Sequence, residues 1–149
     1  LSLSDGWCGA WASAKGRSMS SSPALLPLAV SLGDPAGIGP EVVAKSWDRR
    51  DELNLPPFVA VGDPRSISAV WDGEIIVLEN PRDADSAFDH GLPLMPVPAA
   101  ESGVPGCPTV AGAHCSLDAL ELAVGLARSG SVSAVVTGPI SKQQLYSIG

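Results

Sequence analysis

Residues 25–45 have the sequence LLPLAVSLGDPAGIGPEVVAK, which contains a strand-like run, a glycine-rich turn and a helix start in succession. The apolar run Leu25–Leu32 ends abruptly at the turn, as a buried strand of a parallel sheet does. Pro40 suits the first position of a helix because its missing N–H costs no hydrogen bond there. Glu41 beside it complements the positive end of the helix dipole. This unit therefore predicts an α/β fold.

The rest of the chain repeats the alternation of strand and helix. Strands are predicted at Phe58–Asp63, Glu74–Leu78 and Ser133–Val136, and helices at Pro64–Trp71, from Thr109 or Ser116 to Arg128, and from Ser141 to Tyr146. Mostly short links between such elements favour a parallel or mixed sheet covered by helices.

Two longer segments allow more specific predictions. The stretch Asn80–Pro108 is rich in Pro, Gly and Asp. We expect a long excursion with one edge strand near Leu92–Val97, and loops of this length often cover a site. In the helix that ends at Arg128, the face predicted to meet the core consists of Leu117, Leu120, Val124 and Ala127, flanked by Leu122 and Leu126.

Residues 1–18 differ from the rest of the chain, because tryptophans lie among Ser, Gly and Ala without periodicity. The sequence begins with Leu, and Met19 precedes the first strand-like run. We therefore predict that residues 1–18 are a non-native or disordered extension. An organelle transit peptide is the alternative, because Lys15, Arg17 and several serines lie in an acid-poor stretch.

The formal net charge is −7. Binding to a nucleic-acid backbone needs clustered Lys and Arg, yet Arg49 and Arg50 are followed at once by Asp51 and Glu52, so we expect no nucleic-acid partner. No uninterrupted apolar run approaches the roughly 20 residues of a membrane helix, so we expect no membrane partner either. A small anion is compatible with this charge, because backbone N–H groups can hold it locally.

The three cysteines are Cys8, Cys107 and Cys115, and their irregular spacing predicts no disulfide framework. Cys107, His114 and Cys115 lie close in sequence, but their spacing matches no common zinc pattern. We interpret the thiols as ordinary small residues of a loop and a helix. His90 and His114 are weak candidates for catalysis.

The first candidate site is the turn Gly33–Glu41. Its glycines let the backbone approach a ligand closely, and the helix N-terminus after it offers free N–H groups to an anion. Asp34, Gly37, Gly39 and Glu41 are the predicted lining residues. The turn matches neither the dinucleotide fingerprint nor a Walker A loop. A tight structural turn, in which the Asp34 side chain is hydrogen-bonded to the local backbone, explains the same residues equally well.

The second candidate site follows the strand Ser133–Val136. Thr137 can donate a hydroxyl, Gly138 lets the backbone turn, and Lys142 can bring a positive charge to a phosphate. The alternative is a plain strand-to-helix turn with Ser141 as its N-cap. Ligands of open α/β sheets bind at the carboxyl ends of strands, so we predict that both turns meet at one edge of the sheet.

Together the two turns resemble motifs of the 4-hydroxythreonine-4-phosphate dehydrogenase family. Leu32–Glu41 is similar to the family's opening motif and Val136–Lys142 to its second motif, in the same order and at a similar separation. The Asp-Pro-Ala insertion that begins at Asp34 distinguishes the first motif from the shorter Gly-Asp-Gly-Ile-Gly-Pro-Glu of the related isocitrate and isopropylmalate dehydrogenases. The resemblance extends from Pro27 to the end of the chain.

The resemblance implies a two-domain fold like that of isocitrate and isopropylmalate dehydrogenases, a cytoplasmic setting, and a homodimer with its active site at the subunit interface. It implies NAD as cofactor and a phosphorylated hydroxy-amino acid as substrate. In that reaction 4-phosphooxy-L-threonine is oxidised and loses carbon dioxide, as a step of pyridoxal 5'-phosphate biosynthesis. A divalent metal, namely zinc, magnesium or cobalt, would polarise the alcohol oxygen.

The resemblance is incomplete, because family members continue past the second motif into a Gly-His-Thr-Glu motif and three metal-binding histidines. Neither His90 nor His114 matches these. We therefore expect residues 19–149 to be the N-terminal portion of such a subunit, truncated at its C-terminus, with no metal ligands of its own and inactive alone. Two alternatives stay open. One is a dehydrogenase of threonate or erythronate 4-phosphate, and the other is a non-catalytic domain that binds a phosphorylated metabolite.

Overall fold

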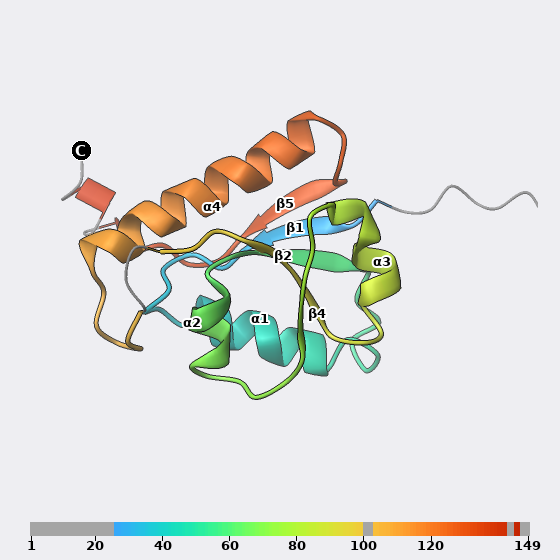
Figure 1. The fold of residues 1–149 in the computed structure, drawn as a ribbon, viewed down its shortest axis with the longest axis horizontal. Helices are drawn as coiled ribbons and strands as arrows, with labels where there is room; N and C mark the ends of the chain where they lie inside the picture. Colours follow the sequence, from blue (N-terminus) through green and yellow to red (C-terminus); the bar gives the residue numbers. More distant parts are fainter. Residues whose placement is uncertain (1–25, 100–102, 143–144, 147–149) are drawn as a thin grey trace, which may run out of the picture.

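The computed structural model describes residues 26–99, 103–142 and 145–146. Within them lies one sheet, with strand order β3-β4-β2-β1-β5 (Figure 1). Every pairing between these strands is parallel, which confirms the predicted α/β class. The strands are β1 (Leu28–Ser31), β2 (Phe58–Gly62), β3 (Ile75–Val77), β4 (Leu92–Pro96) and β5 (Ala134–Thr137).

Helices cover both faces of the sheet (Figure 1). The helices are α1 (Gly39–Asp48), α2 (Pro64–Ser68), the short 3-10 helix η1 (Pro81–Asp83), α3 (Ala84–Ala87) and α4 (Val110–Arg128). Helices α1 and α2 lie on one face and α4 on the other. Over the described residues, α4 is long and apolar enough to cross a membrane by length and composition alone, but here it packs on β1, β2 and β5.

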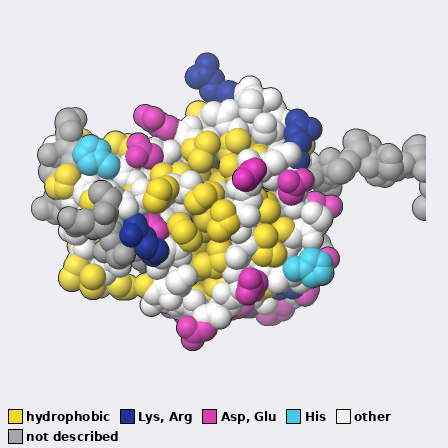
Figure 2. Space-filling model, in the orientation of Figure 1, with side chains coloured by type: hydrophobic (Ala, Val, Ile, Leu, Met, Phe, Trp, Pro, Cys, Tyr) yellow, Lys and Arg dark blue, Asp and Glu magenta, His cyan; other side chains and the backbone are white. Residues whose placement is uncertain are grey.

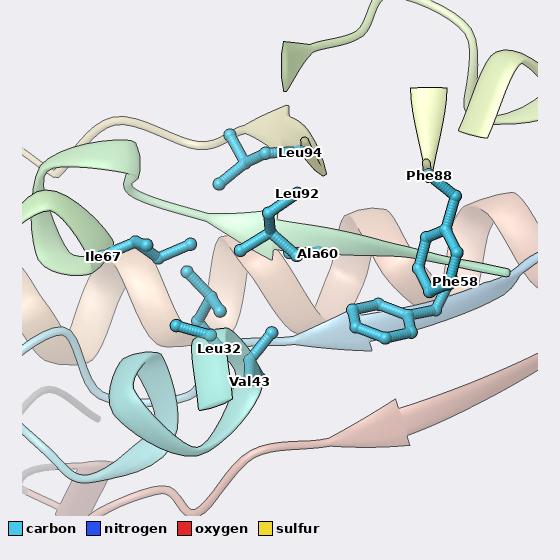
Figure 3. Close-up of a cluster of buried hydrophobic side chains, with 9 residues drawn as sticks. Leu32, Val43, Phe58, Ala60, Ile67, Phe88, Leu92 and Leu94 are labelled. Carbon is cyan, nitrogen blue, oxygen red and sulfur yellow. The ribbon is translucent and has the colours of Figure 1, made fainter. Parts of the chain in front are cut away.

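The core has two parts because β1 and β2 present alternate side chains to opposite faces. On the α1 side, Leu32, Val43 and Ile67 pack with apolar side chains of β2 and β4 (Figure 3). Phe58 and Phe88 meet there edge to face, with ring centroids 5.0 Å apart, a favoured geometry for aromatic pairs.

Helix α4 meets the sheet through small side chains on the other face. Ala119 and Ala123 are buried against β1 and β2. The predicted face was right in part, since Ala127 and the flanking Leu122 and Leu126 pack against this core. It was wrong at Val124, which is 41% exposed, and Leu117 and Leu120 are only partly buried. Alanines let the helix approach the sheet closely, while the flanking leucines cover the margins of the contact.

The ends of α4 are set by local hydrogen bonds. Thr109 caps the helix by accepting the Gly112 N–H at 3.1 Å, so the earlier of the two predicted starts is right. Ser116 is buried inside the helix and donates to the Gly112 carbonyl at 2.8 Å, so it is not the cap. The helix ends at Arg128 as predicted, followed by Gly130 with a φ of 70°.

The excursion Asn80–Pro108 contains more structure than its composition suggested. It includes η1, α3 and β4. The prediction that β4 is an edge strand was wrong, because β4 lies between β3 and β2. Pro93 pairs with β3 only, and the register with β2 begins at Leu94. The proline therefore lies before the β2 ladder, where its missing N–H does not interrupt that pairing.

The remaining strand and helix predictions up to β5 agree with the structure to within a few residues. The helix predicted from Ser141 to Tyr146 includes residues outside the described ranges and stays a prediction. The predicted extension 1–18 lies outside the described residues. The larger two-domain arrangement stays a prediction.

Candidate functional site

The two predicted turns meet at the carboxyl ends of β1 and β5. These strands are neighbours, with Ser31 in register with Thr137. The Asp34 N–H donates to the Pro139 carbonyl at 3.2 Å, and the Gly138 N–H donates to the Ser31 carbonyl at 2.7 Å. The predicted meeting of the turns at one edge of the sheet is therefore confirmed.

Glycines make this close approach feasible. A Cβ on Gly33 would overlap the Pro139 carbonyl, and Gly33 also has a φ of 73°. A Cβ on Gly39 or Gly138 would overlap the Leu32 carbonyl. Packing between the turns accounts for Gly33 and Gly138, and packing within the first motif accounts for Gly39, in each case without any ligand, as the structural interpretation of the sequence allowed.

Asp34 forms the tight turn that its sequence context also predicted. Its side chain is buried and accepts the Ala36 N–H at 2.9 Å, and its carbonyl accepts the Gly37 N–H at 2.9 Å. A Cβ on Gly112 would lie 3.3 Å from the Asp34 Oδ1. The carboxylate therefore lies beside the first turn of α4, where the helix dipole favours negative charge.

A cleft of about 330 Å³ lies between the two turns. It is lined by Asp34, Ala36, Gly37, Ile38, Pro108, Pro139, Ile140 and Ser141. At its edge α1 begins without a side-chain cap at Ile38, so the first N–H groups of α1 are not used by a capping side chain. Backbone donors at a helix start and a mostly apolar wall suit a small ligand with an anionic group.

The other predicted site residues lie around this cleft rather than in its lining. Gly39, Thr137 and Gly138 line a second, apolar groove on the α1 side of the sheet. Glu41 is paired with Lys45 on the exposed side of α1. Lys142 is exposed and lines neither space. Asp34 and Gly37 therefore line the cleft beside the second turn, whereas Glu41 and Lys142 do not line it.

Part of the excursion Asn80–Pro108 folds over the first turn, which agrees with the expectation that this long segment covers a site. The Gly106 N–H donates to the Ala36 carbonyl at 2.8 Å. A Cβ on Gly103 would contact Pro35 at 3.0 Å. Pro108 completes one wall of the cleft. Sequence reasoning missed Pro108 as a site residue, and the only signal for it was the Pro- and Gly-rich composition of the segment.

An ion pair that sequence reasoning missed anchors the start of this loop. Asp63, whose side chain is fully buried, pairs with Arg65 at 2.7 Å. The Asp63 carboxylate accepts the Ala99 N–H at 3.2 Å, and the Arg65 Nη2 donates to the Ala99 carbonyl at 2.6 Å. Asp63 also caps α2 by accepting the Arg65 N–H at 2.9 Å. Asp63 and Arg65 therefore hold both the N–H and the carbonyl of Ala99.

The same contacts determine the ionisation of Asp63. Burial raises the pKa of the Asp63 carboxyl, but hydrogen bonds from Arg65 and from the Ala99 N–H outweigh burial, so the net pKa is below its usual value. Nearby, Cys115 donates to the Val97 carbonyl at 3.3 Å. Burial and the negative charge of Asp63 raise the pKa of the Cys115 thiol to about 11. That thiol is protonated at neutral pH and is a poor nucleophile.

The histidines and cysteines do not converge. His90, His114 and Cys107 are exposed, while Cys115 is buried. Figure 2 shows histidine side chains at opposite ends of the face in view. Across residues 26–99, 103–142 and 145–146, no three His, Cys, Asp or Glu side chains gather where they could hold a metal ion. No chemical step can therefore be assigned to a metal on these residues.

A family model and a curated relative match the chain by sequence. The family model described as pyridoxal phosphate biosynthetic protein PdxA matches residues 55–149. The 4-hydroxythreonine-4-phosphate dehydrogenase of Zymomonas mobilis subsp. mobilis is 47% identical over 123 residues, which are 83% of this chain and 37% of the relative. The matched family region includes the second turn but not the first.

Solved structures agree with the sequence comparison. The structure of 4-hydroxythreonine-4-phosphate dehydrogenase from Klebsiella pneumoniae matches with a TM-score of 0.71 at 26% identity, over 83% of this chain and 40% of that one. A terephthalate 1,2-cis-dihydrodiol dehydrogenase from Burkholderia xenovorans LB400 matches with a TM-score of 0.64 at 25% identity, over 82% and 36% of the chains. This chain spans well under half the length of these relatives. On the strength of the family match, the chain belongs to the pyridoxal phosphate biosynthetic protein PdxA family.

Proposed function

We propose that this chain is the N-terminal portion of an NAD- and divalent-metal-dependent dehydrogenase that oxidatively decarboxylates 4-phosphooxy-L-threonine in pyridoxal 5'-phosphate biosynthesis. One observation carries the proposal: in a member of this family, the two motif turns join at the ends of β1 and β5 and share a cleft. The proposal includes a cytoplasmic homodimer. It also includes the inactivity of this chain alone, because the metal ligands would come from elsewhere in the family's polypeptide.

In this proposal the cleft binds and orients the phosphorylated end of the substrate. The N–H groups at the start of α1 attract the phosphate. Lys142 follows the cleft residue Ser141 without lining the cleft itself, and its exposed side chain adds a cation near the entrance. NAD, when bound, would accept the hydride from the alcohol carbon, and the hydroxyl proton would be released. The resulting β-keto acid loses carbon dioxide, and the carbon that carried the carboxylate takes up a proton. The bound metal would supply polarisation of the alcohol oxygen.

Titration calorimetry on the chain tests the binding role of the cleft. We expect 4-phosphooxy-L-threonine to bind more tightly than 4-hydroxy-L-threonine, because the phosphate makes the main contacts. Lys142→Ala should weaken binding of the phosphorylated ligand, whereas Arg128→Ala, at the far end of α4, should not. Equal binding of both ligands, or no binding of either, would count against the proposal. Production of NADH by the chain alone would refute its expected inactivity.

A dehydrogenase of a different alcohol is the second candidate. It is favoured by the match to the terephthalate 1,2-cis-dihydrodiol dehydrogenase, whose named substrate carries no phosphate. The same titrations with threonate 4-phosphate, erythronate 4-phosphate and a cis-dihydrodiol separate the candidates. Preference for the dihydrodiol would replace the proposed substrate class.

A further inference from the structure

The segment between β4 and α4 passes over the carboxyl ends of β2 and β1 (Figure 1). We call its described residues, 97–99 and 103–109, the strap. At its start the Val97 N–H donates to the Gly62 carbonyl at 2.8 Å, and at its end Thr109 caps α4. The cleft lies beside this path, so the position of the strap determines part of the shape of the cleft.

The strap supports the first turn by direct contact. A Cβ on Gly103 would lie 3.0 Å from the Pro35 Cβ, so the two backbones already meet closely there. The Gly106 N–H donates to the Ala36 carbonyl at 2.8 Å. Ala36 of the turn and Pro108 of the strap both line the cleft. A displaced strap would therefore move one lining residue and release the backbone of another.

Ala99 is the point at which charged side chains hold the strap. Its N–H donates to the Asp63 carboxylate at 3.2 Å, and its carbonyl accepts the Arg65 Nη2 at 2.6 Å. With both of its polar backbone groups bonded, this buried residue has a fixed orientation. Gly103 follows closely in sequence, and a span of four residues reaches at most about 14 Å. The position of Ala99 therefore restricts where Gly103 can meet the first turn.

Helix capping alone does not account for the Asp63–Arg65 pair. Asp63 accepts the Arg65 N–H at the start of α2, yet a neutral Ser, Thr or Asn would cap a helix as well. The Asp63 side chain is fully buried, and removing a carboxylate from water costs free energy that an ion pair recovers only with good geometry. Arg65 supplies that geometry, because its Nε and Nη2 bond the carboxylate oxygens while Nη2 also reaches the Ala99 carbonyl. The contact with the strap is what a neutral cap would lack.

We propose that Asp63 and Arg65 are positioning residues for the cleft, because they hold the strap where it supports the first turn. Neither residue lines the cleft, so both act through the strap and not on the ligand. Loss of the contact at Ala99 frees the strap to leave the first turn and thereby weakens ligand binding. The effect on ligand binding rests on the proposed function of the cleft, whereas the effect on the strap does not.

Hydrogen exchange of the Gly106 amide tests this role, because that N–H is bonded to Ala36 only while the strap lies on the first turn. The test variant is Arg65→Lys, which keeps the charge but lacks the forked geometry, and NMR follows the exchange. We expect the Gly106 amide to exchange about tenfold faster, the factor that corresponds to one hydrogen bond to a charged group. The same variant should bind 4-phosphooxy-L-threonine several-fold more weakly in titration calorimetry.

Two controls separate positioning from general stability. Arg82→Lys matches the test variant, because the exposed Arg82 also donates its Nη2 to a backbone carbonyl, that of Gly130 at 3.1 Å, beyond the far end of α4. Leu94→Ala removes core packing on the α1 side of the sheet, so it lowers the stability of the whole fold. Both controls should leave exchange at Gly106 unchanged, since local opening of the strap does not require global unfolding.

The possible results decide the matter in each case. An unchanged exchange rate at Gly106 in Arg65→Lys would overturn the proposal, and so would an equal acceleration in either control. Faster exchange combined with unchanged affinity for a bound ligand would also overturn it. If Arg65→Lys does not fold, Asp63→Asn takes its place, because asparagine can still cap α2 without the charge. If the unaltered chain binds no 4-phosphooxy-L-threonine, the proposed function fails, and exchange at Gly106 still decides whether the pair positions the strap.

Discussion

Gly138 has no room for a side chain, because a Cβ there would meet the backbone of both Ser31 and Leu32. We expect Gly138→Ala to push the second turn away from β1 and to lower the free energy of unfolding by about 1–3 kcal/mol. Gly125 is the control, since a Cβ at this position in α4 meets nothing within 4 Å. Gly125→Ala should stabilise the protein by about 0.5–1 kcal/mol. Urea unfolding measures both, and equal effects would contradict the packing argument.

The Asp63–Arg65 pair makes stability depend on pH. The folded-state pKa of Asp63 lies below its value in the unfolded chain, which is about 3.9. Its contribution is therefore present at neutral pH and is lost as pH falls below about 4, through the folded-state pKa. We expect Asp63→Asn to cost about 1.5 kcal/mol at pH 7 and progressively less in acid.

Urea unfolding of wild type and Asp63→Asn across a pH series measures this difference. A cost that stays constant down to about pH 2 would show that the charge of Asp63 is not responsible. Arg65→Lys is the companion variant, because lysine keeps the charge but cannot bond the carboxylate and the Ala99 carbonyl in the same forked geometry. It should reproduce part of the loss.

The two described cysteines should differ in reactivity. Cys107 is exposed and Cys115 is buried, and the raised pKa of about 11 leaves Cys115 protonated near pH 8. Iodoacetamide should therefore alkylate Cys107 rapidly and Cys115 only on unfolding. Peptide mass spectrometry after timed labelling gives both rates. Similar rates for the two thiols would contradict the packing of α4 against Val97.

At the scale of elements, the position of β4 between β2 and β3 has a measurable consequence. Leu94 is fully buried among β2, α1 and α2 side chains (Figure 3). Leu94→Ala should cost about 2–5 kcal/mol, the usual range for a buried leucine. Val77→Ala in the edge strand β3 should cost less than about 1 kcal/mol. Denaturant unfolding compares them, and a small cost at Leu94 would favour the edge position that the sequence suggested.

The elements that sequence predicted well are those whose signal is local. Helix α4 starts after Thr109, which caps it with a hydrogen bond, and ends before Gly130, which has a positive φ. Residue type alone therefore indicates both ends of the helix. The inner face of α4 was missed because hydrophobicity favours leucine, whereas contact with a sheet favours the small Ala119 and Ala123. The position of β4 depends on which distant strands pair with it, and the Pro- and Gly-rich composition around it gave a misleading local signal.

At the scale of the whole molecule, metal should not affect the stability of this chain. The described residues offer no set of three ligands for an ion, so zinc has no site among them that would favour the folded state. We expect the melting temperature to be the same with zinc chloride and with EDTA. A saturable rise with zinc would reveal a metal site and contradict this expectation.

The site was predictable in position but not in detail. Parallel strands place their carboxyl ends together, so two turns that each follow a strand were expected to meet, and Asp34 and Pro139 do so. The directions of Glu41 and Lys142 depend on rotation within helices, which the motifs do not specify. Pro108 lines the cleft, and Asp63 and Arg65 hold Ala99 of the same excursion; these contacts span residues far apart in sequence, so the motifs do not indicate them.

The close contact between the two turns limits which residues can be changed to alter the ligand preference of the cleft. Gly33, Gly39 and Gly138 are committed to backbone contact, so a randomised library that includes them would mostly yield misfolded clones. Ile38 is 59% exposed and lines the cleft together with Ile140. Diversity confined to those two isoleucines would reshape the entrance while leaving the scaffold beneath it undisturbed.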